Sequence, residues 1–272
     1  MEQFVNINAL VLNICAFANK QSTIDDENRE DLMNGEINKA VQFIHKKYEE
    51  TIFQNGDTPI PYQEVRFWVR YFQNGLEPFY RHEKVETISD VILGLVHSVY
   101  EQMSSLDFAI QNLQYETTLI LFRTFYERCT ILYFLINHEE CINPYAELYG
   151  KKENFNPEIF NSVASDPYQW AKSCIKKEQI SFEDIAAEAD FYPDYEYWFL
   201  LSEQIVHSLP LILIEPKRRF EDFVKTFTIL LPHLLVSIIT DGFHEIGEAE
   251  TYCFFKITES LIELIKADKK KD

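Results

Sequence analysis

The stretch Glu116–Asn137, ETTLILFRTFYERCTILYFLIN, is a long apolar segment that contains neither Gly nor Pro. At 3.6 residues per turn, its apolar side chains fall on nearly every side of a helix. A helix of this kind is expected in the middle of a bundle, covered by other helices. Arg123, Glu127 and Arg128 interrupt the segment, so it does not predict a membrane span. The segment therefore predicts the central helix of an all-α fold.

Helical spacing continues on both sides of this segment. Apolar residues recur at steps of three and four from residue 85 to 103, which is typical of an amphipathic helix. Asp166-Pro167 is a favourable helix start, and Ser181 with Asp184 resembles a capping box. Further helices are predicted at 2–19, 26–53, 62–72, 193–209, 216–240 and 246–266.

The fold class follows from these helices and from the scarcity of Gly. The chain has 272 residues and only 7 Gly, too few for an all-β protein with many tight turns. We expect an all-α helical bundle at 81–272, preceded by an N-terminal helical extension at 1–80.

The net charge limits the classes of partner. With 25 basic and 44 acidic residues the formal charge is −19, which disfavours broad binding to nucleic acid or to an anionic membrane. A nucleic-acid enzyme with this balance must concentrate its basic residues locally. Otherwise the charge favours a protein partner, in particular a basic one.

The five cysteines form no CxxC pair. A scattered, odd-numbered set in a chain of this length predicts reduced thiols and a cytoplasmic protein. Cys129 lies in the apolar segment and is expected to be buried. The run His138-Glu139-Glu140-Cys141 contains metal-ligand types, but consecutive residues on a helix end point apart, so no metal site is predicted. No cofactor motif occurs, so no cofactor is predicted.

Arg123 and Glu127 are four residues apart and share one face of the central helix. Two hypotheses follow, because a buried charge must find a partner. The pair is either a mutual salt bridge inside the bundle or the lining of a polar functional site.

The segment Tyr195–Ser208 holds a second group of candidates. Tyr195 and Ser202 are spaced to share a helical face, and His207 falls in the last turn before Pro210. The negative end of a helix favours a protonated imidazole. His207 could therefore act as a general acid or bind a phosphate, or it could merely cap carbonyl groups.

The Arg123…Glu127 helix, followed by Tyr195, Ser202 and His207, resembles a bacterial helical domain family similar to the HEPN superfamily. This superfamily includes abortive-infection proteins and toxin components. The resemblance covers roughly residues 84–265. It implies a homodimeric helical bundle that cleaves RNA without a metal in phage defence, with an antitoxin or another protein as partner.

The resemblance also implies roles for residues. His207 takes the place of the superfamily's catalytic His. The residues just before it are not basic, so Arg123 would supply the guanidinium from another helix. Glu127 would orient Arg123, while Ser202 and Tyr195 would donate hydrogen bonds. The alternatives are a non-catalytic binding or sensor module for a phage or host protein, and a scaffold that acts beside a partner.

The aromatic helix at 62–72 allows two hypotheses. Its rings, at Phe67, Trp68, Tyr71 and Phe72, could stack on nucleic-acid bases or pack in the core. The high aromatic content of the whole chain, 15%, favours core packing.

Overall fold

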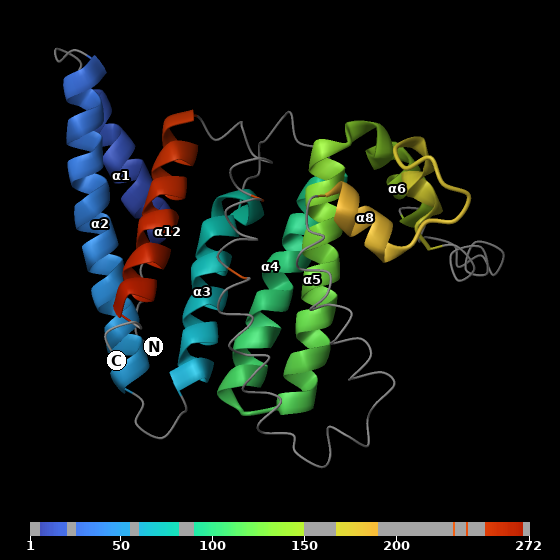
Figure 1. Ribbon diagram of the computed structural model, residues 1–272, viewed down its shortest axis with the longest axis horizontal. Helices are drawn as coiled ribbons and strands as arrows, with labels where there is room; N and C mark the ends of the chain where they lie inside the picture. Colours follow the sequence, from blue (N-terminus) through green and yellow to red (C-terminus); the bar gives the residue numbers. More distant parts are fainter. Residues whose placement is uncertain are drawn as a thin grey trace. The chain divides into compact units, whose positions relative to one another are not determined.

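The computed structural model describes residues 6–20, 26–54, 60–81, 90–149, 167–189, 231, 238 and 248–268. Within these ranges the chain forms eight α-helices and two short 3₁₀ helices, with no strand (Figure 1). The all-α prediction is confirmed. The helices are α1 (Ile7–Lys20), α2 (Asp26–Gln54), α3 (Ile60–Arg81), α4 (Asp90–Gln111), α5 (Tyr115–Asn137), η1 (Glu139–Cys141), α6 (Ile142–Tyr149), η2 (Gln169–Ser173), α8 (Phe182–Glu188) and α12 (Glu248–Asp268).

The chain divides into two compact units. The first comprises residues 1–78, 106–115 and 217–272, and the second comprises 79–105 and 116–216. The first unit therefore joins the N-terminal helices to the C-terminal helix, and the proposed extension at 1–80 shares its unit with α12.

In the first unit, α1, α2 and α12 pack side by side (Figure 1). The Sγ atoms of Cys15 on α1 and Cys253 on α12 lie 3.8 Å apart in the interior. The Tyr71 hydroxyl of α3 lies 2.8 Å from Thr258 Oγ1 of α12. Both contacts span a large sequence separation, so burial of the C-terminal helix holds the two ends of the chain in one unit.

Helix α3 carries the aromatic residues of the first unit. The rings of Phe67, Tyr71 and Phe72 are fully buried and Trp68 is nearly so. Buried rings cannot reach a base, so the core-packing hypothesis is confirmed. The edge-to-face contact of Phe67 with Trp68, at 5.3 Å between centroids, is a geometry that aromatic pairs prefer.

The end predicted for this helix, residue 72 just before Asn74-Gly75, is wrong, because α3 continues to Arg81. A Gly inside a helix costs only about 1 kcal/mol relative to Ala. Leu76, which follows it, is fully buried. Its burial outweighs that cost, since a buried Leu contributes about 1.5–3 kcal/mol.

In the second unit, α5 has the predicted central position. Its residues Phe122, Phe125, Leu132 and Leu135 have no exposed surface, and Cys129 is buried as expected. Leu119, Tyr126 and Phe134 are buried as well and extend the buried surface around most of the helix, which explains its apolar composition. The preceding helix α4 is tied to α5 by polar contacts, including Arg128 Nη1 to the carbonyl of Ser98 at 3.3 Å.

The shorter elements of the second unit adjoin α5. Ser181 and Asp184 form the predicted capping box at the start of α8. Phe182 then packs edge-on against Tyr126 of α5, with centroids 6.1 Å apart. The expected helix start at Asp166-Pro167 is not an α-helix, since a turn at Pro167 leads into η2.

The helices predicted at 193–209 and 216–240 lie outside the described residues, apart from two helical positions, Leu231 and Ile238. Among the helices that are described, none combines the length and apolar composition needed to cross a membrane.

Candidate functional site

The predicted pair on α5 forms an ion pair. Arg123 Nε lies 3.3 Å from Glu127 Oε1, one helical turn away. Their side chains retain 29% and 24% of their exposable surface. The mutual salt bridge is therefore confirmed, and both charged groups still reach solvent.

The pair lies at the edge of the buried face of α5. Phe122 and Tyr126 flank it along the sequence and are buried. A guanidinium at the boundary between an apolar core and solvent interacts with anions more strongly than in bulk water, because the effective dielectric constant is lower. The arrangement suits Arg123 to an anion that approaches from solvent.

The remaining predicted site residues, His207, Ser202 and Tyr195, lie outside the described residues. Their distances to Arg123 are therefore not part of the observed geometry, and their roles stay predictions.

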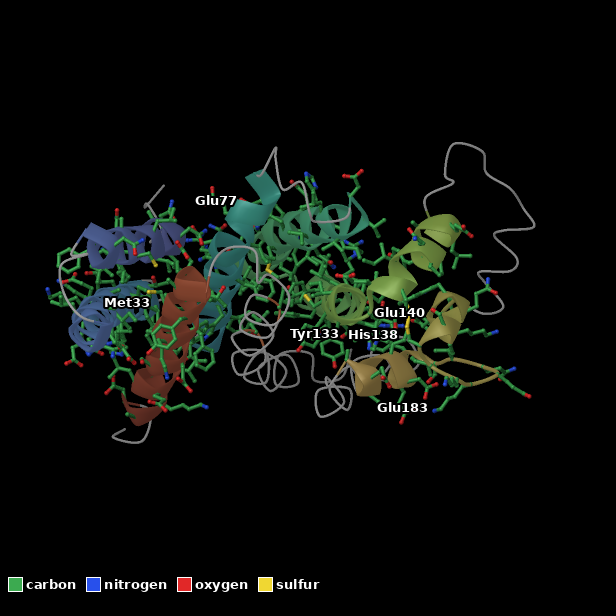
Figure 2. The ribbon with its side chains drawn as sticks, turned by 90° about the horizontal axis from the view of Figure 1, so that it is seen from above. Met33, Glu77, Tyr133, His138, Glu140 and Glu183 are labelled. Atoms are coloured by element: carbon green, nitrogen blue, oxygen red, sulfur yellow. A yellow bond between two sulfur atoms is a disulfide. The ribbon has the colours of Figure 1, made fainter. Side chains whose placement is uncertain are left out.

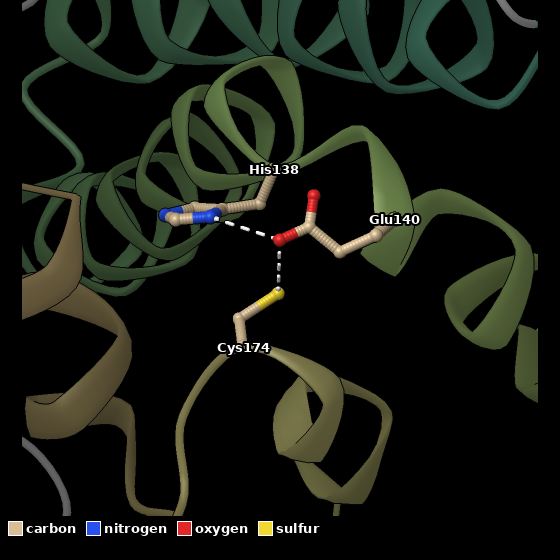
Figure 3. A group of neighbouring side chains, drawn as sticks. All are labelled: His138, Glu140 and Cys174. Carbon is tan, nitrogen blue, oxygen red and sulfur yellow. Dashed lines mark hydrogen bonds and ion pairs between the residues drawn. The ribbon is translucent and has the colours of Figure 1, made fainter.

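A second polar group lies at the C-terminal end of α5. Glu140 Oε1 lies 3.5 Å from His138 Nδ1 and 3.2 Å from Cys174 Sγ. Figure 2 shows His138 and Glu140 beside one another, and Figure 3 shows the imidazole and the sulfur facing the same carboxylate oxygen. Cys141 is bonded to Cys174 through a disulfide. We call His138, Glu140, Cys141 and Cys174 the Cys174 cluster.

The expectation that His138 and Glu140 point apart is wrong. It assumed that both belong to one helix end, but α5 ends at Asn137. His138 has φ −134° and ψ 71°, which is not a helical conformation. This single non-helical residue turns the imidazole toward Glu140 on the next turn.

Backbone hydrogen bonds fix the positions of Cys141 and Cys174 in the Cys174 cluster. The Cys141 amide donates to the His138 carbonyl at 2.9 Å, which closes η1. The Cys174 amide donates to the Ala171 carbonyl at 3.0 Å, at the end of η2. Trp170 and Ala171 are buried and anchor η2, so Cys174 is positioned by packing as well as by its disulfide.

The expectation of reduced thiols throughout is wrong for Cys141 and Cys174. Sequence separation hid the pair, which lies 33 residues apart and outside any CxxC spacing. The free cysteines are Cys15, Cys129 and Cys253, all buried. Burial raises the pKa of each of these three thiols above its ordinary value, so they stay protonated and unreactive near neutral pH.

The His138 ring has a defined setting. It lies against Phe134, with 4.5 Å between ring centroids. Its second nitrogen, Nε2, lies 4.0 Å from Glu188 Oε1 of α8. The imidazole therefore has one nitrogen toward Glu140 and the other toward Glu188.

One more His–carboxylate group occurs among the described residues. His45 Nε2 lies 3.0 Å from Asp268 Oδ2, and Nδ1 lies 4.0 Å from Glu49 Oε2. One ligand atom from each of His45, Glu49 and Asp268 lies within 4.8 Å of the other two, but the group contains no cysteine. The group links α2 to the end of α12.

The sequence pointed to His138, Glu140 and Cys141 as metal-ligand types, but not to Cys174 as their partner. The one sequence feature that could have indicated this partner is that Cys174 is an isolated cysteine in a polar region. Such a cysteine has many possible roles, so it does not by itself predict a contact with Glu140. Comparison of the chain with protein-family models, with curated proteins and with solved structures gives no match.

Proposed function

We propose that this protein is a HEPN-like, metal-independent endoribonuclease, or a catalytically weakened relative, that acts in bacterial phage defence. The resemblance of its Arg…Glu and Tyr…Ser…His segments to that superfamily suggests the activity. The structural observation that supports it is the solvent-accessible Arg123–Glu127 pair on the central helix. The proposal includes a cytoplasmic location and a homodimer, both by analogy with the superfamily.

In this proposal Arg123 binds the scissile phosphate of the RNA. A guanidinium suits this role because its planar donors match two phosphate oxygens. Glu127 holds the guanidinium through Nε at 3.3 Å, which fixes its plane before the substrate arrives. Preorganised positive charge of this kind stabilises the developing charge on the phosphate in the transition state.

The chemical step needs no metal. A base removes the proton of the ribose 2′-hydroxyl, and the 2′-oxygen forms a bond to phosphorus. The bond from phosphorus to the 5′-oxygen breaks, and an acid donates a proton to that oxygen. We assign the acid or base role to His207, and hydrogen-bond donation to Ser202 and Tyr195.

The overall charge makes a specific prediction about binding. With a net charge of −19, most of the surface repels RNA, and attraction must come from few cationic groups. Affinity should therefore depend on salt with a shallow slope, since few counterions are released from the RNA.

The test is cleavage of total RNA by the purified full chain in the presence of a metal chelator. The proposal expects cleavage that resists chelation and is abolished by His207→Ala, with a cooperative unfolding transition retained. Absence of cleavage, or a folded His207→Ala variant that remains active, would contradict it.

A second candidate function is supported by the charge itself. A chain with an excess of 19 acidic residues suits a non-catalytic sensor that recognises a basic phage or host protein, or an antitoxin. This candidate expects no RNA cleavage and a complex whose formation weakens as salt increases.

A further inference from the structure

We propose that reduction of the Cys141–Cys174 disulfide creates a binding site for one zinc ion, with Cys141, Cys174, His138 and Glu140 as its four ligands. The site is separate from the Arg123–Glu127 pair, and the proposal does not depend on ribonuclease activity.

The distances already approach those of a zinc site. The ligand atoms of His138, Glu140 and Cys174 all lie within 4.8 Å of one another. Two ligands on a tetrahedral zinc ion, each bonded at 2.0–2.3 Å, are about 3.3–3.8 Å apart. The Glu140 separations of 3.5 Å from His138 and 3.2 Å from Cys174 differ from that range by at most a few tenths of an ångström. These three ligands need only small side-chain movements, and the Cys141 sulfur takes the fourth position once its bond to Cys174 is broken.

The electrostatics of the Cys174 cluster explain why reduction of its disulfide favours binding of a cation. In the disulfide, the Cys174 sulfur carries no proton and no charge, so its 3.2 Å separation from Glu140 is a neutral contact. After reduction, two sulfurs and a carboxylate occupy the same small volume. These electron-rich donor atoms repel one another, and a bound divalent cation removes this repulsion.

The geometry argues against a nucleophilic cysteine as the alternative. A catalytic thiol needs an imidazole in hydrogen-bond contact to take its proton. Here the carboxylate of Glu140 lies between the sulfur of Cys174 and the imidazole of His138 (Figure 3).

The donor set selects the metal. Two thiolates, one imidazole nitrogen and one carboxylate oxygen form a mixed set that suits zinc. Magnesium and calcium prefer oxygen ligands throughout and are disfavoured. The surroundings agree, because metal-bound His residues usually donate their second N–H to a carboxylate. With zinc on Nδ1 of His138, Nε2–H points toward Glu188, which is 4.0 Å away.

Conversion of the disulfide to the zinc site is a balanced reaction when a dithiol is the reductant. The dithiol gives two electrons and two protons to the Cys141–Cys174 bond and itself becomes a disulfide. Zinc then replaces the two thiol protons, which are released to solvent. Intracellular thiol pools supply reductants of this class, and disulfides in cytosolic proteins are usually transient or redox-sensing.

The experiment measures Co²⁺ and Zn²⁺ binding to the full-length chain under exclusion of oxygen. One sample is reduced with a phosphine and the other is kept oxidised. We expect the reduced chain to bind one Co²⁺, with the near-ultraviolet absorption of thiolate-to-cobalt charge transfer, and Zn²⁺ to displace it. The oxidised chain should show no such absorption. Equal binding by the two samples would overturn the proposal.

Paired variants identify the ligands without disturbing the core. Glu140→Gln is compared with Glu139→Gln, since both remove one exposed carboxylate from η1. His138→Gln is compared with His97→Gln, an exposed His on α4. We expect Glu140→Gln and His138→Gln to weaken Zn²⁺ binding at least tenfold, with both controls unchanged. Circular dichroism verifies folding, and folded ligand variants that bind as tightly as their controls would overturn the assignment.

Discussion

Glu140 Oε1 lies 3.2 Å from the sulfur of Cys174, a residue 34 positions further along the chain. This contact and the neighbouring disulfide join η1, at the end of α5, to η2. They bring metal-ligating groups from two separate segments into one place on the second unit. The oxidation state of Cys141 and Cys174 therefore determines whether the Cys174 cluster contains a covalent cross-link or two free thiol ligands.

The disulfide makes a simple prediction about thiol counts. The chain has five cysteines, of which Cys15, Cys129 and Cys253 are free. Protein isolated without reductant and then denatured should react with three equivalents of a thiol reagent, and with five after reduction. Five reactive thiols before reduction would show that Cys141 and Cys174 are not bonded.

The capping box at α8 should contribute measurably to stability. Ser181 Oγ accepts a hydrogen bond from the Asp184 amide at 3.3 Å, and the Ser181 amide donates to Asp184 Oδ2 at 3.0 Å. We expect Ser181→Ala to lower the free energy of unfolding by about 1 kcal/mol, because a helix N-terminal donor loses its acceptor. Urea denaturation measures the change. Ser181→Asp, which retains an acceptor, should lose less than half as much.

Asp184 should also make stability depend on pH. Its side chain hydrogen-bonds to Lys177 and to the Ser181 amide, and these bonds lower the pKa of Asp184 below its ordinary value. A carboxyl group with a lowered pKa in the folded state stabilises the fold above its unfolded pKa of about 3.9. This contribution disappears as pH falls through the lower, folded-state pKa.

The comparison is between the natural chain and Asp184→Asn. The difference in unfolding free energy should be constant from about pH 7 to pH 5, should shrink below about pH 4, and should vanish once the pH is below the folded-state pKa, where Asp184 is protonated in both states. Glu178→Gln, which changes an exposed carboxylate nearby, is the control and should give a small difference throughout. A difference for Asp184→Asn that grows as pH falls would contradict the assignment.

Asp107 on α4 holds two arginines of α3. Its Oδ1 lies 2.9 Å from Arg66 Nε and its Oδ2 lies 3.1 Å from Arg70 Nη2, with all three side chains partly buried. Asp107→Asn removes the shared negative charge and leaves two neighbouring guanidinium groups. We expect a loss of about 1.5–3 kcal/mol, the range for hydrogen bonds to charged groups.

Thermal and urea unfolding of Asp107→Asn test this expectation. Asp90→Asn, at the exposed start of the same helix, is the matched control, and it should cost less than about 1 kcal/mol through the helix dipole alone. Similar losses in the two variants would show that the Asp107 network contributes little.

The sequence correctly predicted the features that depend on interactions between residues close together in the chain. The central helix followed from its apolar residues, such as Phe122 and Leu132, and the start of α8 followed from Ser181 and Asp184. The extent of α3 was underestimated, because burial of Leu76 depends on tertiary packing that a local Gly signal does not report.

The Cys174 cluster was missed for two physical reasons. His138 leaves the helical conformation, so helix geometry did not describe where its side chain points. Cys174 comes from a distant segment, and its approach to Glu140 depends on packing of η2 through Trp170. The Arg123–Glu127 ion pair, by contrast, needed only a spacing of four residues on one helix.

The most direct test of the proposed function is the rate of RNA cleavage by Arg123→Ala and Arg128→Ala, measured in single turnovers with chelator present. Both variants remove one guanidinium from α5, but Arg128 lies elsewhere on the helix and contacts the Ser98 carbonyl. We predict a loss of about 100-fold or more for Arg123→Ala, the usual effect of removing one preorganised charge-stabilising group, and less than about threefold for Arg128→Ala. A folded Arg123→Ala variant that cleaves RNA as fast as the natural chain would contradict the proposal.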